Sequence, residues 1–193
     1  IAACVTGLAC LALYGRDALQ LYRKRVRRVI ELNSRMAGIA LINFAIAVVL
    51  TVACAAFGVL DRYVGALVFL FTFGWLTGLG LAKLYKIVAF VTWLECYGPV
   101  LGKTKTPRVQ DLVVEPRAIK WFWFYFAAVA IGTLCLFVGA SLPFRVATAA
   151  MTAASAGIAL EILRTRRLIN VSDALRLPAG AHKPRLLFTF VPG

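Results

Sequence analysis

The sequence contains a single histidine, His182, among its 193 residues. Bis-histidine haem sites, histidine-ligated copper centres and catalytic triads all require imidazole groups at defined positions. Because His182 lies in a polar C-terminal stretch, the apolar segments of this chain supply no imidazole to such a site. The sequence therefore excludes these three kinds of centre within its apolar segments.

Acidic residues are also scarce, with eight Asp and Glu against 22 Lys and Arg. A carboxylate pair for acid–base catalysis needs two acids close together, and here the acids are scattered among cations. The sequence has no P-loop, dinucleotide-binding fingerprint or zinc-type spacing. Its five cysteines form no C-x-x-C pair and lie mostly in apolar runs, as is typical of small buried hydrophobic side chains. We expect a protein that is not an enzyme and has no catalytic residue, metal or cofactor.

Apolar side chains dominate the sequence, at 62% of the residues and a mean hydropathy of +0.84. A soluble domain of this size could not bury so much apolar surface, so lipid must surround most of the chain. The stretch from Val64 to Ala82 is uncharged, and about 20 apolar residues in a helix cross a ~30 Å hydrocarbon core. We predict an all-α, polytopic membrane protein with a bundle of about five transmembrane helices, over residues 1–14, 36–60, 64–86, 121–140 and 146–163.

The segments between these spans are polar or basic. Residues 16–35 predict an amphipathic helix at the membrane surface, and residues 101–120 predict an irregular loop. Residues 60–63 and 141–145 predict tight turns. Residues 166–193 form a basic tail, which we expect to be ordered only by a partner.

Two further expectations concern the ends of predicted spans. The chain starts at Ile1 with an apolar run that is short for a span, so we expect further residues upstream in a longer protein. After Lys83, the third helix either continues or bends into the membrane interface. Trp93 and Tyr97 favour the interface, where aromatic side chains are enriched.

The distribution of cations predicts the orientation. Twenty of the 22 Lys and Arg fall in residues 16–35, 83–120 and 164–193, whereas the opposite turns hold only Arg62 and Arg145. Cytoplasmic loops are rich in Lys and Arg, so we expect a bacterial inner-membrane protein with a cytoplasmic C-terminus. These cations alternate with apolar spans, so we predict membrane lipids and other membrane subunits as partners, and no nucleic acid.

Small residues mark faces for helix packing. Gly74, Gly78 and Ala82 recur every four residues in the third span, and such a ridge lets another backbone approach closely. The fifth span is mostly Ala, Thr, Ser and Gly, and we place Ala153 and Gly157 at a packed interface. Asn43 in the second span is expected to hydrogen-bond another helix.

Charged residues near the membrane surface suggest one candidate binding site. Lys83 and Lys86 share a helical face and repel each other unless an anion lies between them. With Glu95 they form a candidate lipid or anion site, which would take a lipid headgroup or a buried anion or quinone headgroup. Glu161, three residues before Arg164, predicts an ion pair at headgroup level, with a proton-relay role as the alternative.

One part of the chain resembles a known group of proteins. The run FGWLTGLGLAKLYKIVAFVTWLECYGPVLG, followed by PRVQDL, is similar to small membrane proteins related to subunit I of haem-copper oxidases, including the NnrS-like group. The likeness covers roughly residues 16–120. It implies a haem held by histidines within the spans, yet this chain has none there, and Ala89 replaces the proline of the pattern YKIVPF. If the kinship holds, this chain has lost the haem or its ligands lie outside the sequence.

The function that these features favour is a non-catalytic membrane subunit that packs against, stabilises or helps assemble a larger complex, such as a respiratory one. One alternative is a transporter or channel for a small anion or metabolite, with a path lined by Lys83, Lys86, Asn43 and Glu161. The other is a redox membrane protein that binds haem or a quinone.

Overall fold

The computed structural model describes residues 2–24, 31–181 and 183–184, and the chain divides into two compact units, Ile1–Glu31 and Leu32–Gly193. The described part of the first unit is a helix, α1 (Ala2–Arg23). It continues without a break past the predicted end of the first span and through Arg16 and Asp17, whose exposed side chains lie 3.8 Å apart. A separate surface helix starting at residue 16 is therefore a wrong prediction, because one glycine, Gly15, does not stop a helix. Residues 25–30 lie outside the described residues.

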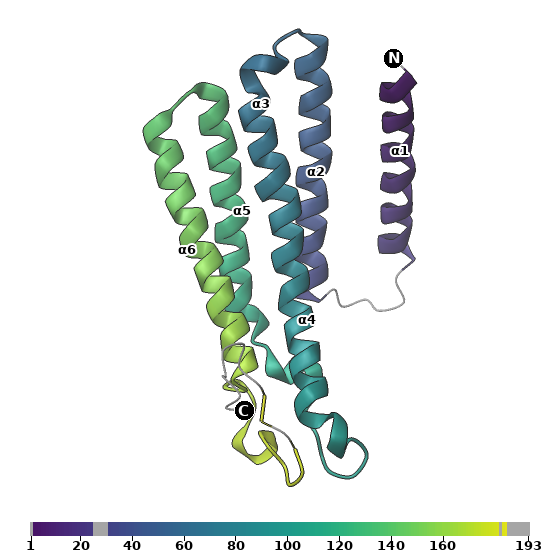
Figure 1. Cartoon of the computed structure of the whole chain (residues 1–193), viewed down its shortest axis with the longest axis vertical. Coiled ribbons are helices and arrows are strands. Elements are labelled where there is room, and N and C mark those ends of the chain that lie inside the picture. Colours follow the sequence, from purple (N-terminus) through teal and green to yellow (C-terminus); the bar gives the residue numbers. More distant parts are fainter. Residues whose placement is uncertain (1, 25–30, 182, 185–193) are drawn as a thin grey trace, which may run out of the picture. The chain divides into compact units, whose positions relative to one another are not determined.

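The described part of the second unit contains four helices that are long and apolar enough to cross a membrane (Figure 1). The prediction of an all-α membrane bundle is confirmed. The helical elements are α2 (Leu32–Ala56), α3 (Leu60–Phe69), the π-helix η1 (Leu70–Thr77), α4 (Gly78–Tyr97), α5 (Glu115–Val138) and α6 (Ser141–Arg166). Three short 3₁₀ turns complete it: η2 (Gly98–Val100), η3 (Val109–Leu112) and η4 (Asp173–Leu175).

Two tight turns join these helices into hairpins, and both lie a few residues before the positions that we predicted. The first turn is made by residues 57–59, with Gly58 at a φ of 67°. The second is closed by Gly139 at a φ of 78°, which lets the amide of Ala140 donate to the carbonyl of Cys135. Such left-handed positions favour glycine. Pro143 lies in the first turn of α6, where its missing N–H costs no hydrogen bond.

The stretch from Leu60 to Val100 is continuous helix over 41 residues. At 1.5 Å per residue it is about 60 Å long, twice the ~30 Å thickness of the hydrocarbon core. Its uncharged part, from Tyr63 to Ala82, alone suffices to cross that core. The expectation that the chain bends into the interface after Lys83 is therefore wrong, and α4 extends straight past the first turns of α2 (Figure 1).

The middle of this helix is widened into a π-helix, which the sequence did not reveal. Two carbonyl groups of this π-helix, those of Thr72 and Phe73, accept hydrogen bonds from side-chain hydroxyls. The hydroxyl of Thr77 donates to the carbonyl of Thr72 at 2.9 Å, and the hydroxyl of Tyr125 on α5 donates to that of Phe73 at 2.8 Å. These hydroxyls satisfy carbonyl groups in a region where lipid offers no donor.

The interior of the second unit has two apolar cores. The larger lies among α2, η1, α4, α5 and α6 and is built from aromatic side chains and alanines, including Phe122, Tyr125, Phe126, Ala82 and Ala154. We call this part the bundle. Near its lower end the rings of Tyr85 and Phe122 meet at 6.0 Å, and the amide of Leu32 donates to Glu115. The first residues of α2 and α5 therefore lie level with Tyr85.

Beyond Tyr85, residues 86–114 and 167–181 form what we call the projecting end. Its own core consists of Cys96, Tyr97, Val100, Leu112, Leu168 and Val171. The segment after α6 covers α4, and the hydroxyl of Tyr97 donates to the carbonyl of Arg176. The expectation that the tail is ordered only by a partner is thus wrong for residues 167–181, because Leu168 and Val171 give it apolar anchors.

The predicted loop from residue 101 to 120 is also shorter than expected. Its last part is already helical, since α5 starts at Glu115. Pro116 occupies the first turn of that helix, where proline starts a helix instead of breaking it. The helices α2 and α6 likewise extend about three to five residues beyond the predicted spans at their charged ends.

Candidate functional site

The structure separates the three residues of the predicted lipid or anion site. Lys83 and Lys86 lie exposed on α4, one turn apart. Glu95 lies nine residues further on, about 13 Å along the helix axis, and its carboxylate forms an ion pair with Arg166 from α6. Glu95 therefore links α4 to α6 and does not complete a site with the two lysines.

The predicted packing residues of the third span do meet other helices. A Cβ added to Gly74 would lie 3.1 Å from the Cβ of Asn43 on α2, and one added to Gly78 would lie 2.8 Å from the Phe126 ring on α5. Ala82 is fully buried in the bundle. The side chain of Asn43 packs against Gly74 of η1. Its amide donates to the carbonyl of Ile39 on its own helix, and not to another helix as we expect from the sequence.

Of the two packing residues predicted in the fifth span, only Gly157 is buried against another helix. A Cβ added to Gly157 would lie only 2.2 Å from the Trp121 ring of α5, so the α5–α6 contact needs glycine there. Ala153 is instead exposed, and its neighbour Ala154 is buried. Ala153 belongs to the outer face of α6.

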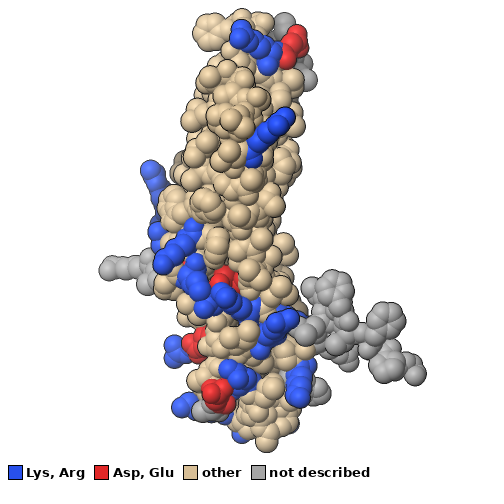
Figure 2. All heavy atoms as spheres, turned by 90° about the vertical axis from the view of Figure 1, so that its left-hand side faces the viewer, with Lys and Arg blue, Asp and Glu red and all other residues tan. Residues whose placement is uncertain are grey.

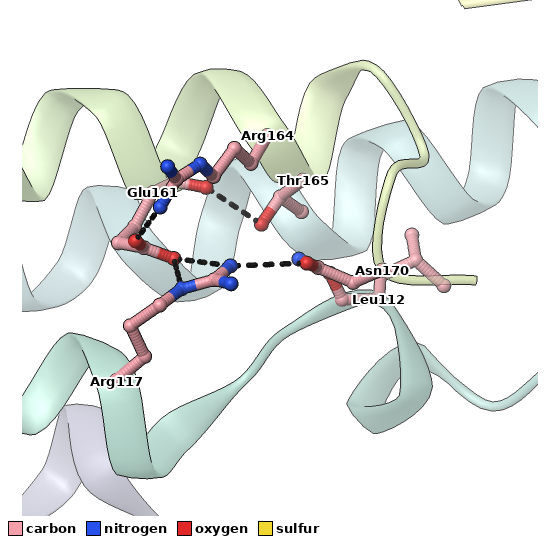
Figure 3. A network of polar contacts seen from close by, with 6 residues as sticks. All are labelled: Leu112, Arg117, Glu161, Arg164, Thr165 and Asn170. Carbon is pink, nitrogen blue, oxygen red and sulfur yellow. Dashed lines mark hydrogen bonds and ion pairs between the residues drawn. The ribbon is translucent and has the colours of Figure 1, made fainter.

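Glu161 on α6 carries a buried carboxylate, and its side chain is 3% exposed. It accepts from Nε of Arg117 on α5 at 2.8 Å and from Nη1 of Arg164 at 2.6 Å (Figure 3). A buried carboxylate is costly unless it is paired and hydrogen-bonded, and two guanidinium groups meet that need. The ion pair predicted between Glu161 and Arg164 is present, and Arg117 joins it.

Arg117 extends this network into the projecting end. Its Nη2 donates to Oδ1 of Asn170 at 3.0 Å, and the Asn170 amide donates to the carbonyl of Leu112 (Figure 3). A second tie runs from Arg166 to Thr92 and Glu95 on α4. These side chains hold the end of α6, the start of α5 and the segment after α6 together.

Sequence reasoning missed Arg117, Asn170 and Arg166 as partners of predicted residues. The sequence does contain a pattern that places Arg117 on a helix, because Lys120 and Trp121 follow it by three and four residues and so share its helical face. It was hidden by the assignment of residues 115–120 to a loop. Asn170 could not have been found, since its role depends on how the chain folds back after α6.

Charged side chains gather at the lower half of the face drawn in Figure 2, whereas the upper half carries few. The turns at the opposite end contribute Arg62 and Arg145. Between these two ends, the stretch from Tyr63 to Ala82 carries no charge, and its length suffices to cross the hydrocarbon core.

The residues present do not fit the haem that the resemblance implies. The chain has one histidine in total, and His182 lies outside the described residues. Over residues 2–24, 31–181 and 183–184 no group of three His, Cys, Asp or Glu comes together as a metal site would need. The four residues of the alternative transport path are not brought together either, because Asn43 packs on Gly74 while Glu161 faces Arg117.

The outer face of α6 is unusual for a helix in lipid. Between residues 147 and 159 every exposed side chain is Ala or Thr, namely Ala149, Thr152, Ala153, Ala156 and Ala159. The exposed faces of the other helices include bulky side chains at similar depth, such as Ile131 and Leu134 on α5 and Ile46 and Val49 on α2. Small residues allow close approach of a second backbone.

Comparison of the chain with protein families, with curated proteins and with solved structures finds no match.

Proposed function

We propose that this protein is a non-catalytic integral membrane subunit that packs against another membrane protein and helps to assemble or stabilise a larger complex, such as a respiratory complex of the bacterial inner membrane. The observation that carries the proposal is the small-residue outer face of α6, centred on Ala153. Its partner is a transmembrane helix of another subunit.

The physical argument rests on what drives helices together in lipid. Lipid tails are as apolar as leucine, so helix association depends on close van der Waals packing and not on hydrophobic burial. Bulky residues such as Ile131 contact lipid well. The face around Ala153 offers lipid little contact area, and it gains most when a second helix backbone lies against it.

The basic projecting end is proposed to be cytoplasmic. Among the described residues, Lys86, the three cations of the α4–α5 connection, and Arg167 and Arg176 belong to this end, whereas Arg62 and Arg145 stand at the other. This asymmetry supports a cytoplasmic C-terminus by the positive-inside rule. The projecting end would then stand in the cytoplasm beside its partner subunits.

Native gels and pull-downs after mild solubilisation from the native membrane test the proposal. The wild-type chain is expected to migrate in a complex larger than its own mass, together with at least one other membrane protein. Ala153→Phe, which fills the small face, is expected to release the chain from that complex. Ile131→Phe, at a position that is also exposed but on α5, is the control and should leave the complex intact.

Two results would overturn the proposal. One is a wild-type chain that runs alone at the mass of one copy in every mild detergent. The other is a cross-link from an Ala153→Cys variant that joins this position only to α1 of the same chain, because the small face would then be covered within the protein itself.

A further inference from the structure

A cavity of about 450 Å³ lies where α5 and α6 leave the apolar band, and nothing in the proposed assembly role uses it. Its lining consists of Arg117, Lys120, Trp121, Phe124, Glu161 and Arg164. A volume of this size suits a small ligand or part of a larger one. The lining is amphipathic, with charged groups followed by two aromatic side chains deeper along α5.

The lining carries a net positive charge. Three cations face one carboxylate, and 3 − 1 gives an excess of two positive charges. Glu161 binds Nε and Nη2 of Arg117 and Nη1 of Arg164. This leaves Nη1 of Arg117, and Nε and Nη2 of Arg164, without a partner among the residues that the structure describes. Lys120 has no ion pair among those residues either.

The geometry suits an anion with several oxygen atoms. The side chains of Arg117 and Arg164 are 40% and 45% exposed, so their remaining donors reach the cavity. Guanidinium groups bind phosphate oxygens through paired hydrogen bonds. Because Glu161 fixes both groups, they are oriented before a ligand arrives, and Glu161 acts as a positioning residue.

The position of the cavity favours a ligand with an apolar part. Arg117, Lys120, Trp121 and Phe124 lie on one face of α5, and the helix is uncharged from Trp121 to its end at Val138. The cations therefore stand at headgroup level and Phe124, which is 45% exposed, stands one turn deeper among the apolar side chains. Basic pockets between transmembrane helices are known to hold acidic headgroups.

We propose that this cavity binds a phosphate ester, and specifically the phosphodiester of an anionic phospholipid. Arg117, Lys120 and Arg164 contact the phosphate oxygens, and Trp121 and Phe124 contact the first methylenes of an acyl chain. A site of this kind differs from general attraction of a basic surface to acidic lipid, because it requires the residues of the cavity and not cations elsewhere at the same membrane depth.

The full-length chain, purified in detergent, tests this proposal by native mass spectrometry and by thermal unfolding with added lipid. Phosphatidylglycerol is the anionic probe, phosphatidylcholine the zwitterionic one and inorganic phosphate the soluble one. We expect one retained phosphatidylglycerol per chain and a rise in melting temperature with it. Phosphatidylcholine should bind at least tenfold more weakly, and inorganic phosphate should give no shift at millimolar concentration.

Variants then locate the site. Lys120→Gln combined with Arg164→Gln should weaken phosphatidylglycerol binding at least tenfold. Lys83→Gln combined with Lys86→Gln removes two cations from α4 near the same depth, and it should change binding less than twofold. Phe124→Ala should weaken phosphatidylglycerol and leave any binding of inorganic phosphate unchanged. If the first double variant does not fold, Lys120→Gln alone is used. It removes only the charge of an exposed side chain, and it should still weaken phosphatidylglycerol binding about threefold.

Three outcomes would overturn the proposal. Equal weakening by both double variants would show general attraction to the basic end. Equal retention of phosphatidylcholine and phosphatidylglycerol would remove the charge selectivity. A melting shift by inorganic phosphate equal to that of the lipid would assign the site to free phosphate and exclude a lipid ligand.

Discussion

The bundle and the projecting end use polar side chains in opposite ways. In the bundle most of them bond to their own helix one turn back, as Asn43 does to Ile39, Thr51 to Ala47 and Thr133 to Val129. In the projecting end they bond across elements, as Trp93 does to Pro107 and Tyr97 to Arg176. The structural order of the bundle thus comes from shape, and that of the projecting end from directed hydrogen bonds.

This difference follows from the solvent of each part. In lipid, a hydroxyl finds its nearest acceptor on its own helix, and close packing of small and aromatic residues holds the helices together. The apolar core of the projecting end is too small to fix the conformation of its irregular segments. Hydrogen bonds between different elements hold those segments in one conformation. Four predictions test this comparison, in order of decreasing effect.

The largest loss of stability is expected from Gly157→Ala in the bundle, although this substitution adds only one methyl group. The added methyl group would lie 2.2 Å from the Trp121 ring, so α5 and α6 must move apart. Overpacking costs about 1–3 kcal/mol and occasionally more, and a contact this short places Gly157→Ala at or above the upper end of that range, well beyond the gain of up to about 1 kcal/mol in helix propensity. Thermal unfolding in detergent, followed by tryptophan fluorescence, should show a clear loss of stability.

Gly80→Ala is the control for that prediction. No atom lies within 4 Å of a Cβ added to Gly80, so the same substitution should be neutral or stabilising there. Equal melting temperatures of the Gly157 and Gly80 variants would contradict the claim that shape holds the bundle.

A smaller loss, of about 2 kcal/mol, is expected from Glu161→Gln at the border of the two parts. It leaves Arg117 and Arg164 without the buried carboxylate that both bind. Because both guanidinium groups are partly exposed, water compensates for some of that loss. Denaturant titration should measure the change, and hydrogen exchange should show faster opening around Leu112. Unchanged stability and exchange would show that the network does not join the two parts.

Two tyrosines allow a direct comparison at the level of single hydroxyl groups. Tyr125→Phe leaves the Phe73 carbonyl without its donor from α5 in the bundle, and it should cost about 1 kcal/mol of total stability. Tyr97→Phe removes the bond to Arg176 in the projecting end and should leave the melting temperature nearly unchanged. Limited trypsin digestion should instead cut faster after Arg176 in the Tyr97 variant only. Faster cutting in both variants would show that the two parts open together.

The smallest effect is expected from Asp173→Asn. This carboxylate is 90% exposed and pairs with Arg176 at 2.9 Å. Exposed ion pairs contribute little, so the free energy of unfolding should change by less than about 0.5 kcal/mol. Raising the salt concentration, which screens this ion pair, should change the free energy of unfolding by a similarly small amount. A loss as large as that of Glu161→Gln would contradict the distinction between buried and exposed pairs.

The sequence predicted the parts of the fold that depend on lipid. The uncharged run from Val64 to Ala82 and the apolar stretches around Asn43 and Ala153 indicated spans, because only helices satisfy their own backbone in hydrocarbon. Helix ends were less accurate, since charged residues such as Glu115 and Arg166 continue a helix into the headgroup region. The π-helix around Gly74 was not predicted, and one of its carbonyl groups bonds to Tyr125 of a different helix, which sequence spacing does not reveal.

Prediction of the site was weaker for a related reason. Neighbours on one helix, such as Glu161 and Arg164, could be paired from their spacing. Glu95 was grouped with Lys83 by sequence distance, whereas its partner Arg166 comes from α6. Which residues of different helices form pairs depends on which helix ends lie at the same position along the bundle axis. That position is set by the packing of the helices.

The unbroken helix from Leu60 to Val100 also has a mechanical consequence. A stiff rod anchored at mid-depth works as a lever, so a force applied at its far end, near Val100, is transmitted to the part of the helix inside the bilayer. The π-helix around Gly74 interrupts the regular α-helix in the middle of this rod, and the hydroxyls of Thr77 and Tyr125 donate to its carbonyl groups. A partner that binds this helix near Val100 is therefore connected, through continuous helix, to the part of the chain inside the bilayer.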